Sequence, residues 1–376
     1  MHLNVAGMSI IVLSSMEVIR DLLNRCSSIY SDRIHAPQRR RREMFHKTFH
    51  SKAVKQFNPH MRDSTHRLLH RMLKEPHDLM DHFMHLTGAL IMDVTNRINV
   101  RDSDDPYIKI VEEAMHGMSV ACVLGTFLVD SIPALEYVPS WFPGADFKRK
   151  ACQWQQVARE LQEVPFAETK RNIEKDVKET AGASYAAGAD TTVLAMGTFA
   201  LAMLKYPEAQ AKAQVELDTV IGHGSLPEWG DPPALLYVTA LVKEVFRWQN
   251  VAPNWSAPHA TSRGQVLRVQ DPSELHVVGN VWYTVHLLDQ SDDSLIQEIY
   301  PDPTSFKPEW FLLNGKLNPD IRDPEAIVFG FGRRWEIFIE PMCPGQHLAL
   351  SSVWLKIASI LATFVLKKAV NKKMGT

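Results

Sequence analysis

The segment Ala187–Thr192, with the sequence AGADTT, combines residues that are unfavourable inside a helix with residues that can carry protons. Glycine inside a helix costs about 1 kcal/mol relative to alanine, and burial of Asp190 without a partner would cost more. Small residues let a flat ligand approach the backbone, and Thr191 can bend the helix by bonding to a carbonyl one turn earlier. An acid beside an alcohol is suited to relaying protons to such a ligand. The alternative is a helix that packs against a neighbour through its small residues.

Cys343 is a second candidate, because it stands with Pro344 and Gly345 at the start of an expected helix. Backbone N–H groups and the helix dipole at such a place favour a thiolate, which could ligate a metal. The alternative is a small buried cysteine, which composition alone would favour. The glycines at 330 and 332 form a single GxG, which is too little to indicate a nucleotide-binding loop.

Charged and imidazole side chains also occur at helical spacing. Glu244 and Arg247, in the sequence KEVFR, share one face of an otherwise apolar helix, so that a charge pair there would be buried and structural. Sixteen histidines include three pairs that could in principle hold a metal from one helix face. These pairs are His46 with His50, His66 with His70, and His82 with His85. No acidic third ligand accompanies any pair closely, so we interpret them as polar helix faces.

Long helices must position these residues. The longest apolar helical run covers about 181–205 and ends before Pro207, which predicts a central buried helix. Helices are also expected at about 39–74, 78–99, 106–136, 147–178, 207–221, 233–249 and 345–366, with short strands at 3–13 and within 267–285. The sequence therefore predicts a mainly α fold with a minor β component, as one domain over residues 1–376.

Composition narrows the classes of protein that need to be considered. A formal charge of -2 provides no basic field for nucleic acid, and 45% hydrophobic residues are ordinary for a globular protein. The apolar run Met8–Leu13 is far shorter than the roughly 20 residues of a spanning helix. Four cysteines without CxxC pairs indicate a reducing compartment rather than a disulfide framework.

Four motifs follow one another along the chain: AGADTT, KEVFR, FKPEWF at 306–311, and FGFGRR at 329–334 followed by CPG. Together they resemble the cytochrome P450 family of haem-thiolate monooxygenases. The flanking segments YPEAQAKAQVELDTVIG and YPDPTSFKPE are similar to the microsomal, fungal branch of that family, so the resemblance spans most of the chain. It implies a cytochrome P450-like fold that is truncated at its N-terminus and carries internal deletions and insertions, with a haem-binding loop at about 329–345.

The resemblance implies haem b (iron protoporphyrin IX) as cofactor, with Cys343 as the axial thiolate whose electron donation favours O–O cleavage. Asp190 and Thr191 match the pair that delivers protons to bound dioxygen. Glu244 and Arg247 match the ExxR motif, which locks the region beneath the haem.

Further residues match the positions that contact the haem propionates. Arg334 matches the loop arginine that pairs with a propionate, and Arg42 matches the arginine of the WxxxR helix. His259 is a further propionate partner by position.

The resemblance also implies the reaction and its partners. One atom of dioxygen would enter an apolar organic substrate, as in secondary metabolism, with electrons from an NADPH-dependent flavoprotein reductase and without any nucleic-acid partner. The family works at the endoplasmic-reticulum membrane surface, although the usual N-terminal anchor is absent from this sequence.

Several departures from the family pattern keep other interpretations open. Residues 335–342 stand between Arg334 and Cys343, where the family has one residue, and Trp310 replaces an arginine, so Glu244 and Arg247 are expected to lose a partner. Gln38 occupies the tryptophan position of WxxxR, and little chain separates Lys170 from AGADTT. A degenerate, non-catalytic relative that cannot hold haem productively is one alternative. A haem-thiolate isomerase or dehydratase is another, which the Asp190–Thr191 pair disfavours.

Overall fold

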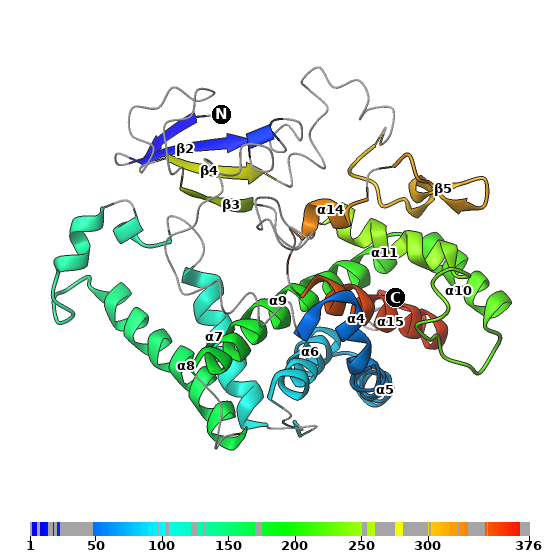
Figure 1. Cartoon of the computed structure of the whole chain (residues 1–376), viewed down its shortest axis with the longest axis horizontal. Coiled ribbons are helices and arrows are strands. Elements are labelled where there is room, and N and C mark those ends of the chain that lie inside the picture. Colours follow the sequence, from blue (N-terminus) through cyan, green and yellow to red (C-terminus); the bar gives the residue numbers. More distant parts are fainter. Residues whose placement is uncertain are drawn as a thin grey trace, which may run out of the picture.

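A computed structural model of the chain describes residues 2–5, 8–13, 18, 21–22, 48–96, 98, 100–101, 105–121, 126–130, 132–169, 175–249, 254–259, 275–280, 300, 302–321, 323–329, 343 and 345–368. Helices make up most of this structure (Figure 1). The longer ones are α5 Asn58–Lys74, α6 Leu79–Asn96, α7 Pro106–Ala121, α8 Asp146–Thr169, α9 Lys175–Lys205, α10 Pro207–Val220, α11 Leu236–Trp248 and α15 Gln346–Thr363. Short helical segments are α4 Ser51–Val54, η2 Lys55–Phe57, η3 Leu128–Asp130, η4 Pro133–Tyr137, η6 Pro308–Phe311 and α14 Glu325–Val328.

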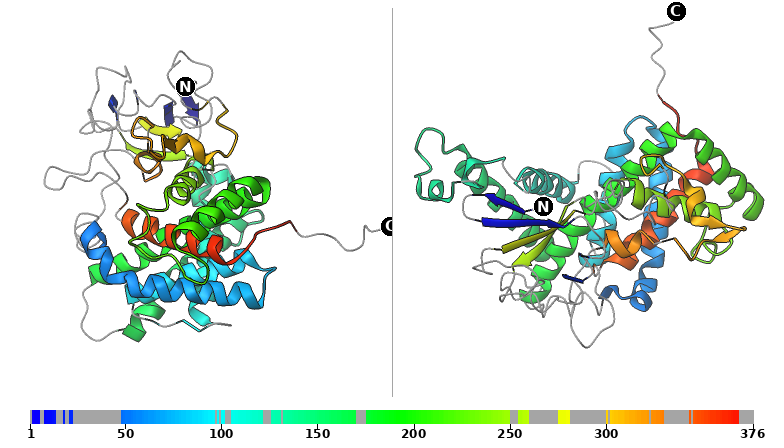
Figure 2. Two further views of the ribbon diagram at one scale, coloured as in Figure 1. Left: turned by 90° about the vertical axis from the view of Figure 1, so that its right-hand side faces the viewer. Right: turned by 90° about the horizontal axis from the view of Figure 1, so that it is seen from above.

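A small sheet lies beside the helical body (Figure 1, Figure 2). Its strands are β1 His2–Val5, β2 Met8–Leu13, β3 Asn254–His259 and β4 Leu275–Asn280, in the order β1-β2-β4-β3. Strand β2 runs parallel to β4 with Ser9 opposite Leu275, whereas the β1–β2 and β3–β4 pairs are antiparallel. The two residues β5 Leu312–Leu313 pair with β6 Lys316–Leu317 in a separate hairpin. The predicted fold class, mainly α with a minor β component, is confirmed.

The helix boundaries follow the local sequence signals. Helix α10 begins at Pro207, whose fixed φ suits a first turn, and the chain leaves it through Gly222 at a φ of 84°. The helix predicted at 106–136 is too long, because α7 ends at Ala121 and a separate 3₁₀ turn begins at Pro133. Pro133 suits the first position of its own 3₁₀ turn, because proline lacks the N–H that a helix leaves unpaired there.

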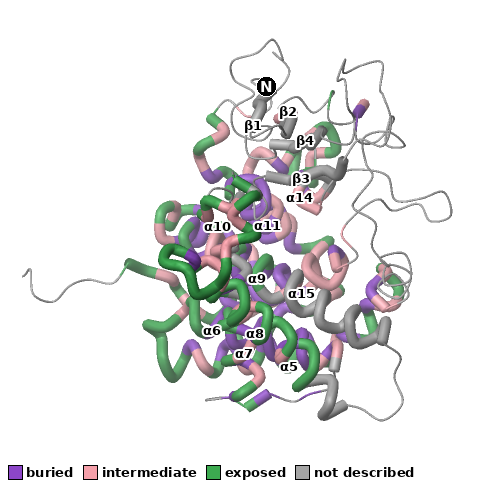
Figure 3. The backbone as a smooth tube through the Cα atoms, turned by 90° about the vertical axis from the view of Figure 1, so that its left-hand side faces the viewer, coloured by how far each residue is buried: buried purple, intermediate pink, exposed green. Residues whose placement is uncertain are grey.

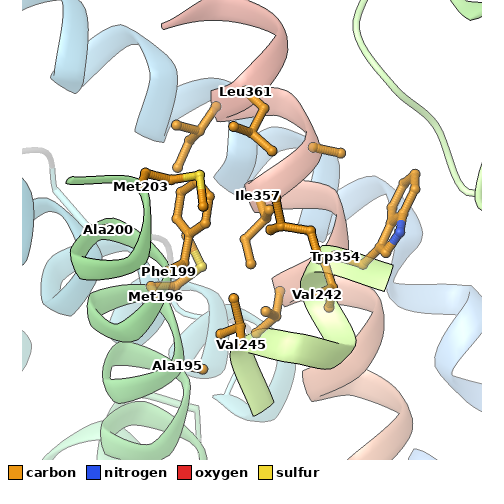
Figure 4. Close-up of a cluster of buried hydrophobic side chains, with 14 of the residues drawn as sticks. Ala195, Met196, Phe199, Ala200, Met203, Val242, Val245, Trp354, Ile357 and Leu361 are labelled. Atoms are coloured by element: carbon orange, nitrogen blue, oxygen red, sulfur yellow. The ribbon is translucent and has the colours of Figure 1, made fainter. Parts of the chain in front are cut away.

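The main core forms where α9, α11 and α15 meet. Figure 4 shows Met196, Phe199 and Met203 of α9 facing Val245 of α11 and Ile357 of α15, all of them fully buried. Buried stretches lie within the helical body, while much of α8 and α10 is exposed (Figure 3). The predicted 181–205 helix therefore lies inside α9, which begins earlier, at Lys175. Among the described residues, no helix is long and apolar enough to span a membrane.

Candidate functional site

Glu244 and Arg247 form a buried, bidentate ion pair on α11. Arg247 Nε donates to Glu244 Oε2 at 2.6 Å, and its Nη2 donates to Oε1 at 2.7 Å. The side chains are 0% and 2% exposed. The i,i+3 spacing places both on one helix face, and the fork of the guanidinium matches the two carboxylate oxygens.

The same pair holds the segment that leads to η6. Arg247 donates to the carbonyl oxygens of Pro303 and Ser305, both at 2.8 Å, while the backbone N–H of Lys307 donates to Glu244 Oε1 at 2.7 Å. Burial raises the pKa of Glu244 to about 7, and the Arg247 hydrogen bonds act in the opposite direction. The pair thus joins α11 to residues 303–307.

At the position where the sequence predicts the loss of an arginine partner for this pair, the structure places two aromatic rings near Arg247. The Trp310 ring centroid lies 4.6 Å from Arg247 Cζ, and the ring of Tyr300 lies 5.1 Å from the same atom. Sequence reasoning missed Tyr300, although an aromatic residue directly before the Pro-Asp-Pro segment was a signal that could have drawn attention to it.

The backbone of Cys343 is bonded to Phe329, at the other end of the loop that precedes Cys343. Its backbone N–H donates to the carbonyl of Phe329 at 3.0 Å, and its own carbonyl accepts from Gln346 N–H at 3.0 Å. The Phe329 ring packs against Phe246 of α11, with centroids 6.0 Å apart. Residues 330–342, including the unusual segment 335–342, lie outside the described residues, but the two ends of this loop are anchored together.

The Cys343 thiol is free and half-buried within the described part of the chain. It precedes α15, whose first residue is Gln346. A free thiol before the first turn of a helix is the kind of donor that a metal ion takes as thiolate.

Lys243 also ties α11 to the stretch before the loop. Its ammonium group bonds to the carboxylates of Asp323 and Glu325, and Glu325 is the first residue of α14. Helix α11 therefore holds two segments that precede the haem-binding loop proposed from the sequence: 303–307 through Arg247, and 323–329 through Lys243 and Phe246.

Asp190 and Thr191 are exposed in the middle of α9, whereas the following Thr192 and Val193 are buried. The expectation that Asp190 would need compensation for burial was therefore wrong. Gly188 has the packing role that was the alternative interpretation, because a Cβ atom there would lie 2.5 Å from Ile91 Cδ1 of α6. The AGADTT segment thus contains both a close helix contact and an exposed polar pair.

The side chains of the three predicted propionate partners are not among those that the structure describes. Arg42 and Arg334 lie outside the described residues, as does Gln38. The backbone of His259 ends β3 opposite His276 of β4.

The described histidine pairs differ in burial: His82 and His85 are buried on α6, which corrects their interpretation as a polar helix face, whereas His66 and His70 fit that interpretation. His82 Nε2 bonds to the carbonyl of Glu75 at 2.6 Å, and His85 Nε2 bonds to the carbonyl of Arg101 at 2.9 Å. His66 and His70 are exposed on α5, and His46 lies outside the described residues. The described part of the chain contains no cluster of three or more metal-ligating side chains.

Comparison with known proteins gives the family. The family described as Cytochrome P450 matches residues 161–375. Cytochrome P450 monooxygenase 98 of Postia placenta is 37% identical, over 98% of this chain and 77% of the relative. Cytochrome P450 monooxygenase ple1 of Rhodocybe pseudopiperita is 35% identical, over 99% of this chain and 77% of the relative. Tryptamine 4-monooxygenase of Psilocybe cyanescens is 33% identical, over 99% and 79%.

The lengths of these alignments also show that this chain lacks residues that its relatives have. The alignment with the Postia placenta protein is 418 residues long, although this chain has 376, so the relative carries residues without a counterpart here. The resemblance found in the ordered motifs is confirmed, together with internal deletions. On the strength of these matches, this chain belongs to the cytochrome P450 family.

Proposed function

We propose that this chain is a haem-thiolate monooxygenase that inserts one atom of dioxygen into an apolar organic substrate, with electrons from an NADPH-dependent flavoprotein reductase. One observation carries the proposal: the free, half-buried Cys343 is bonded through its backbone to Phe329 despite the additional residues between them. Because the loop closes at its base, the insertion does not by itself displace the thiol from the start of α15.

Among the described residues, the free thiol of Cys343 is a donor that suits haem iron. Cys343 Sγ would ligate the iron, and the bound haem would supply the activation of dioxygen. Arg42, Arg334 and His259, which the family resemblance assigns, would hold the propionates. Glu244 and Arg247 do not contact the cofactor in this proposal, because all their described polar contacts are with each other and with residues 303–307.

Asp190 and Thr191 would move protons. Both residues are exposed at the middle of a helix with buried neighbours, so the Asp190 carboxylate is accessible on that side of α9 and Thr191 lies beside it. A carboxylate exchanges protons readily with water, and an adjacent hydroxyl both accepts and donates a hydrogen bond. The pair can therefore pass protons from solvent to a ligand lying against the helix.

Haem content after gel filtration tests the assignment of Cys343. The chain should retain haem in a 1:1 ratio, and Cys343→Ala should lose the thiolate-specific spectrum. Cys152→Ala is the matched control, because Cys152 is exposed on α8 and should leave haem content unchanged. If the wild-type chain takes up no haem, the catalytic proposal is wrong and the degenerate, non-catalytic alternative replaces it. The observation that favours this alternative is the insertion 335–342 before the cysteine.

We further propose that the chain works at the surface of the endoplasmic-reticulum membrane. Support comes from an exposed apolar patch between α7 and α8, whose exposed large side chains are Leu128, Ile132, Tyr137, Trp141 and Phe142. Tryptophan and tyrosine favour the membrane–water interface. Trp141→Ser should weaken sedimentation with phosphatidylcholine–phosphatidylserine vesicles, whereas Leu313→Ser, at an exposed position outside this segment, should not. Equal binding of both variants would contradict this localisation.

A further inference from the structure

We propose that Trp310, together with Tyr300, is the third partner of the Glu244–Arg247 pair and positions Arg247 through the face of its indole ring. The family motif has an arginine at this place, so an aromatic ring would replace a cation. This proposal concerns the protein scaffold and stands whether or not the chain turns over a substrate.

Four of the five N–H groups of the Arg247 guanidinium donate to acceptors among the described residues, which occupies most of the edge of the group. A guanidinium donates within its own plane, and here Nε, Nη1 and Nη2 all have acceptors on Glu244, Pro303 or Ser305. Aromatic rings contact a guanidinium through its face. The 4.6 Å distance from Arg247 Cζ to the Trp310 centroid lies inside the roughly 6 Å range of a cation–π interaction.

Burial should make this interaction strong. Arg247 is 2% exposed, and cation–π attraction increases when the cation is removed from water. Tyr300 contacts both members, with its ring 5.1 Å from Arg247 Cζ and 4.8 Å from the Trp310 ring. The two half-buried rings thus lie beside a cation that is itself removed from water.

An arginine at position 310 would meet acceptors that are already engaged. Glu244 Oε1 accepts from both Arg247 Nη2 and Lys307 N–H. The nearby Glu309 accepts from Lys212 Nζ at 2.5 Å and from Tyr237 Oη at 3.1 Å. A second guanidinium would also place two like charges close together, which an indole ring avoids.

Fluorinated tryptophan separates the electrostatic role of the ring from its packing, because fluorine withdraws charge from the ring face with little change in shape. The full chain and Trp310→Phe should each be prepared with ordinary and with multiply fluorinated tryptophan, and unfolded in urea. The other tryptophans are common to both proteins, so their contributions cancel. Fluorination should lower the folded-to-unfolded ratio of the full chain several-fold more than that of Trp310→Phe. An equal effect in both proteins would overturn the proposal.

Conservative variants at the same position provide a second test. Trp310→Leu should lower the folded-to-unfolded ratio about tenfold, and Trp310→Phe should lower it less, because phenylalanine keeps an aromatic face. Trp310→Arg should be less stable than the wild type. Equal losses of stability in the leucine and phenylalanine variants would mean that Trp310 contributes only by packing. A gain in stability in the arginine variant would show that the ring is not the preferred partner of Arg247. Either result would overturn the proposal.

Discussion

Helices α11 and α9 differ in the burial of their polar residues. On α11, Glu244 and Arg247 are buried, and their described contacts use the edges of both groups. On α9, Asp190 and Thr191 are exposed between buried neighbours. A buried pair that is bonded to its surroundings holds structure, whereas an exposed pair on a central helix contributes little to stability. The contrast separates a buried structural pair from an exposed polar pair within the same helical body.

The largest effect should come from breaking the α11 pair. Glu244→Ala leaves Arg247 as an uncompensated buried charge, which should cost about 3–5 kcal/mol in the free energy of unfolding. Urea denaturation measures this loss. Asp63→Ala is the control, because it removes an i,i+4 pair with Arg67 in which Asp63 is 65% exposed, and it should cost less than about 0.5 kcal/mol. Similar losses for the two variants would contradict the structural role of Glu244.

Helix α15 provides a third case for this comparison. It buries the cation of Lys356, which within the described part of the chain has no carboxylate partner of the kind that Glu244 provides to Arg247 on α11. Lys356 is 1% exposed, and its Nζ has no hydrogen-bond partner among the described residues. Desolvation lowers its pKa to about 8 from an ordinary 10.5. Lys356→Met should therefore stabilise the protein at pH 7, by about 2–3 kcal/mol, because it removes this penalty.

The pH dependence of stability distinguishes this cause from simple packing. Between about pH 8 and 10.5 the unfolded chain holds the lysine proton and the folded chain does not, so wild-type stability should rise with pH across that window. The difference from Lys356→Met should shrink correspondingly. A constant difference from pH 7 to 10.5 would mean that Lys356 is not desolvated in the folded protein.

Asp190 should give the smallest change in stability. Because Asp190 is exposed, Asp190→Asn should alter the free energy of unfolding by less than about 0.5 kcal/mol. If the variant nevertheless diverts reductase-supplied electrons from product to peroxide, its role is proton delivery. Loss of stability comparable with that of Glu244→Ala would contradict the distinction between α9 and α11.

Much of the helical fold could be predicted, because apolar periodicity and proline or glycine boundaries are local signals. Pro207 and Gly222 bound α10 as expected, and Glu244 with Arg247 could be placed on one face by spacing alone. Local signals could not give the exposure of Asp190, which depends on what packs around α9. They also could not bring Trp310 and Tyr300 to Arg247, because that contact joins separate segments of the chain.

The difference spectrum of the dithionite-reduced chain, with and without carbon monoxide, tests the central claim most directly. A strongly red-shifted Soret band is expected, because Cys343, anchored to Phe329, would ligate the iron as thiolate. Cys343→Ala should lack this band while Cys152→Ala retains it. A band typical of histidine- or thiol-ligated haem in the wild-type chain, or no haem spectrum, would contradict the assignment of Cys343 as the axial ligand.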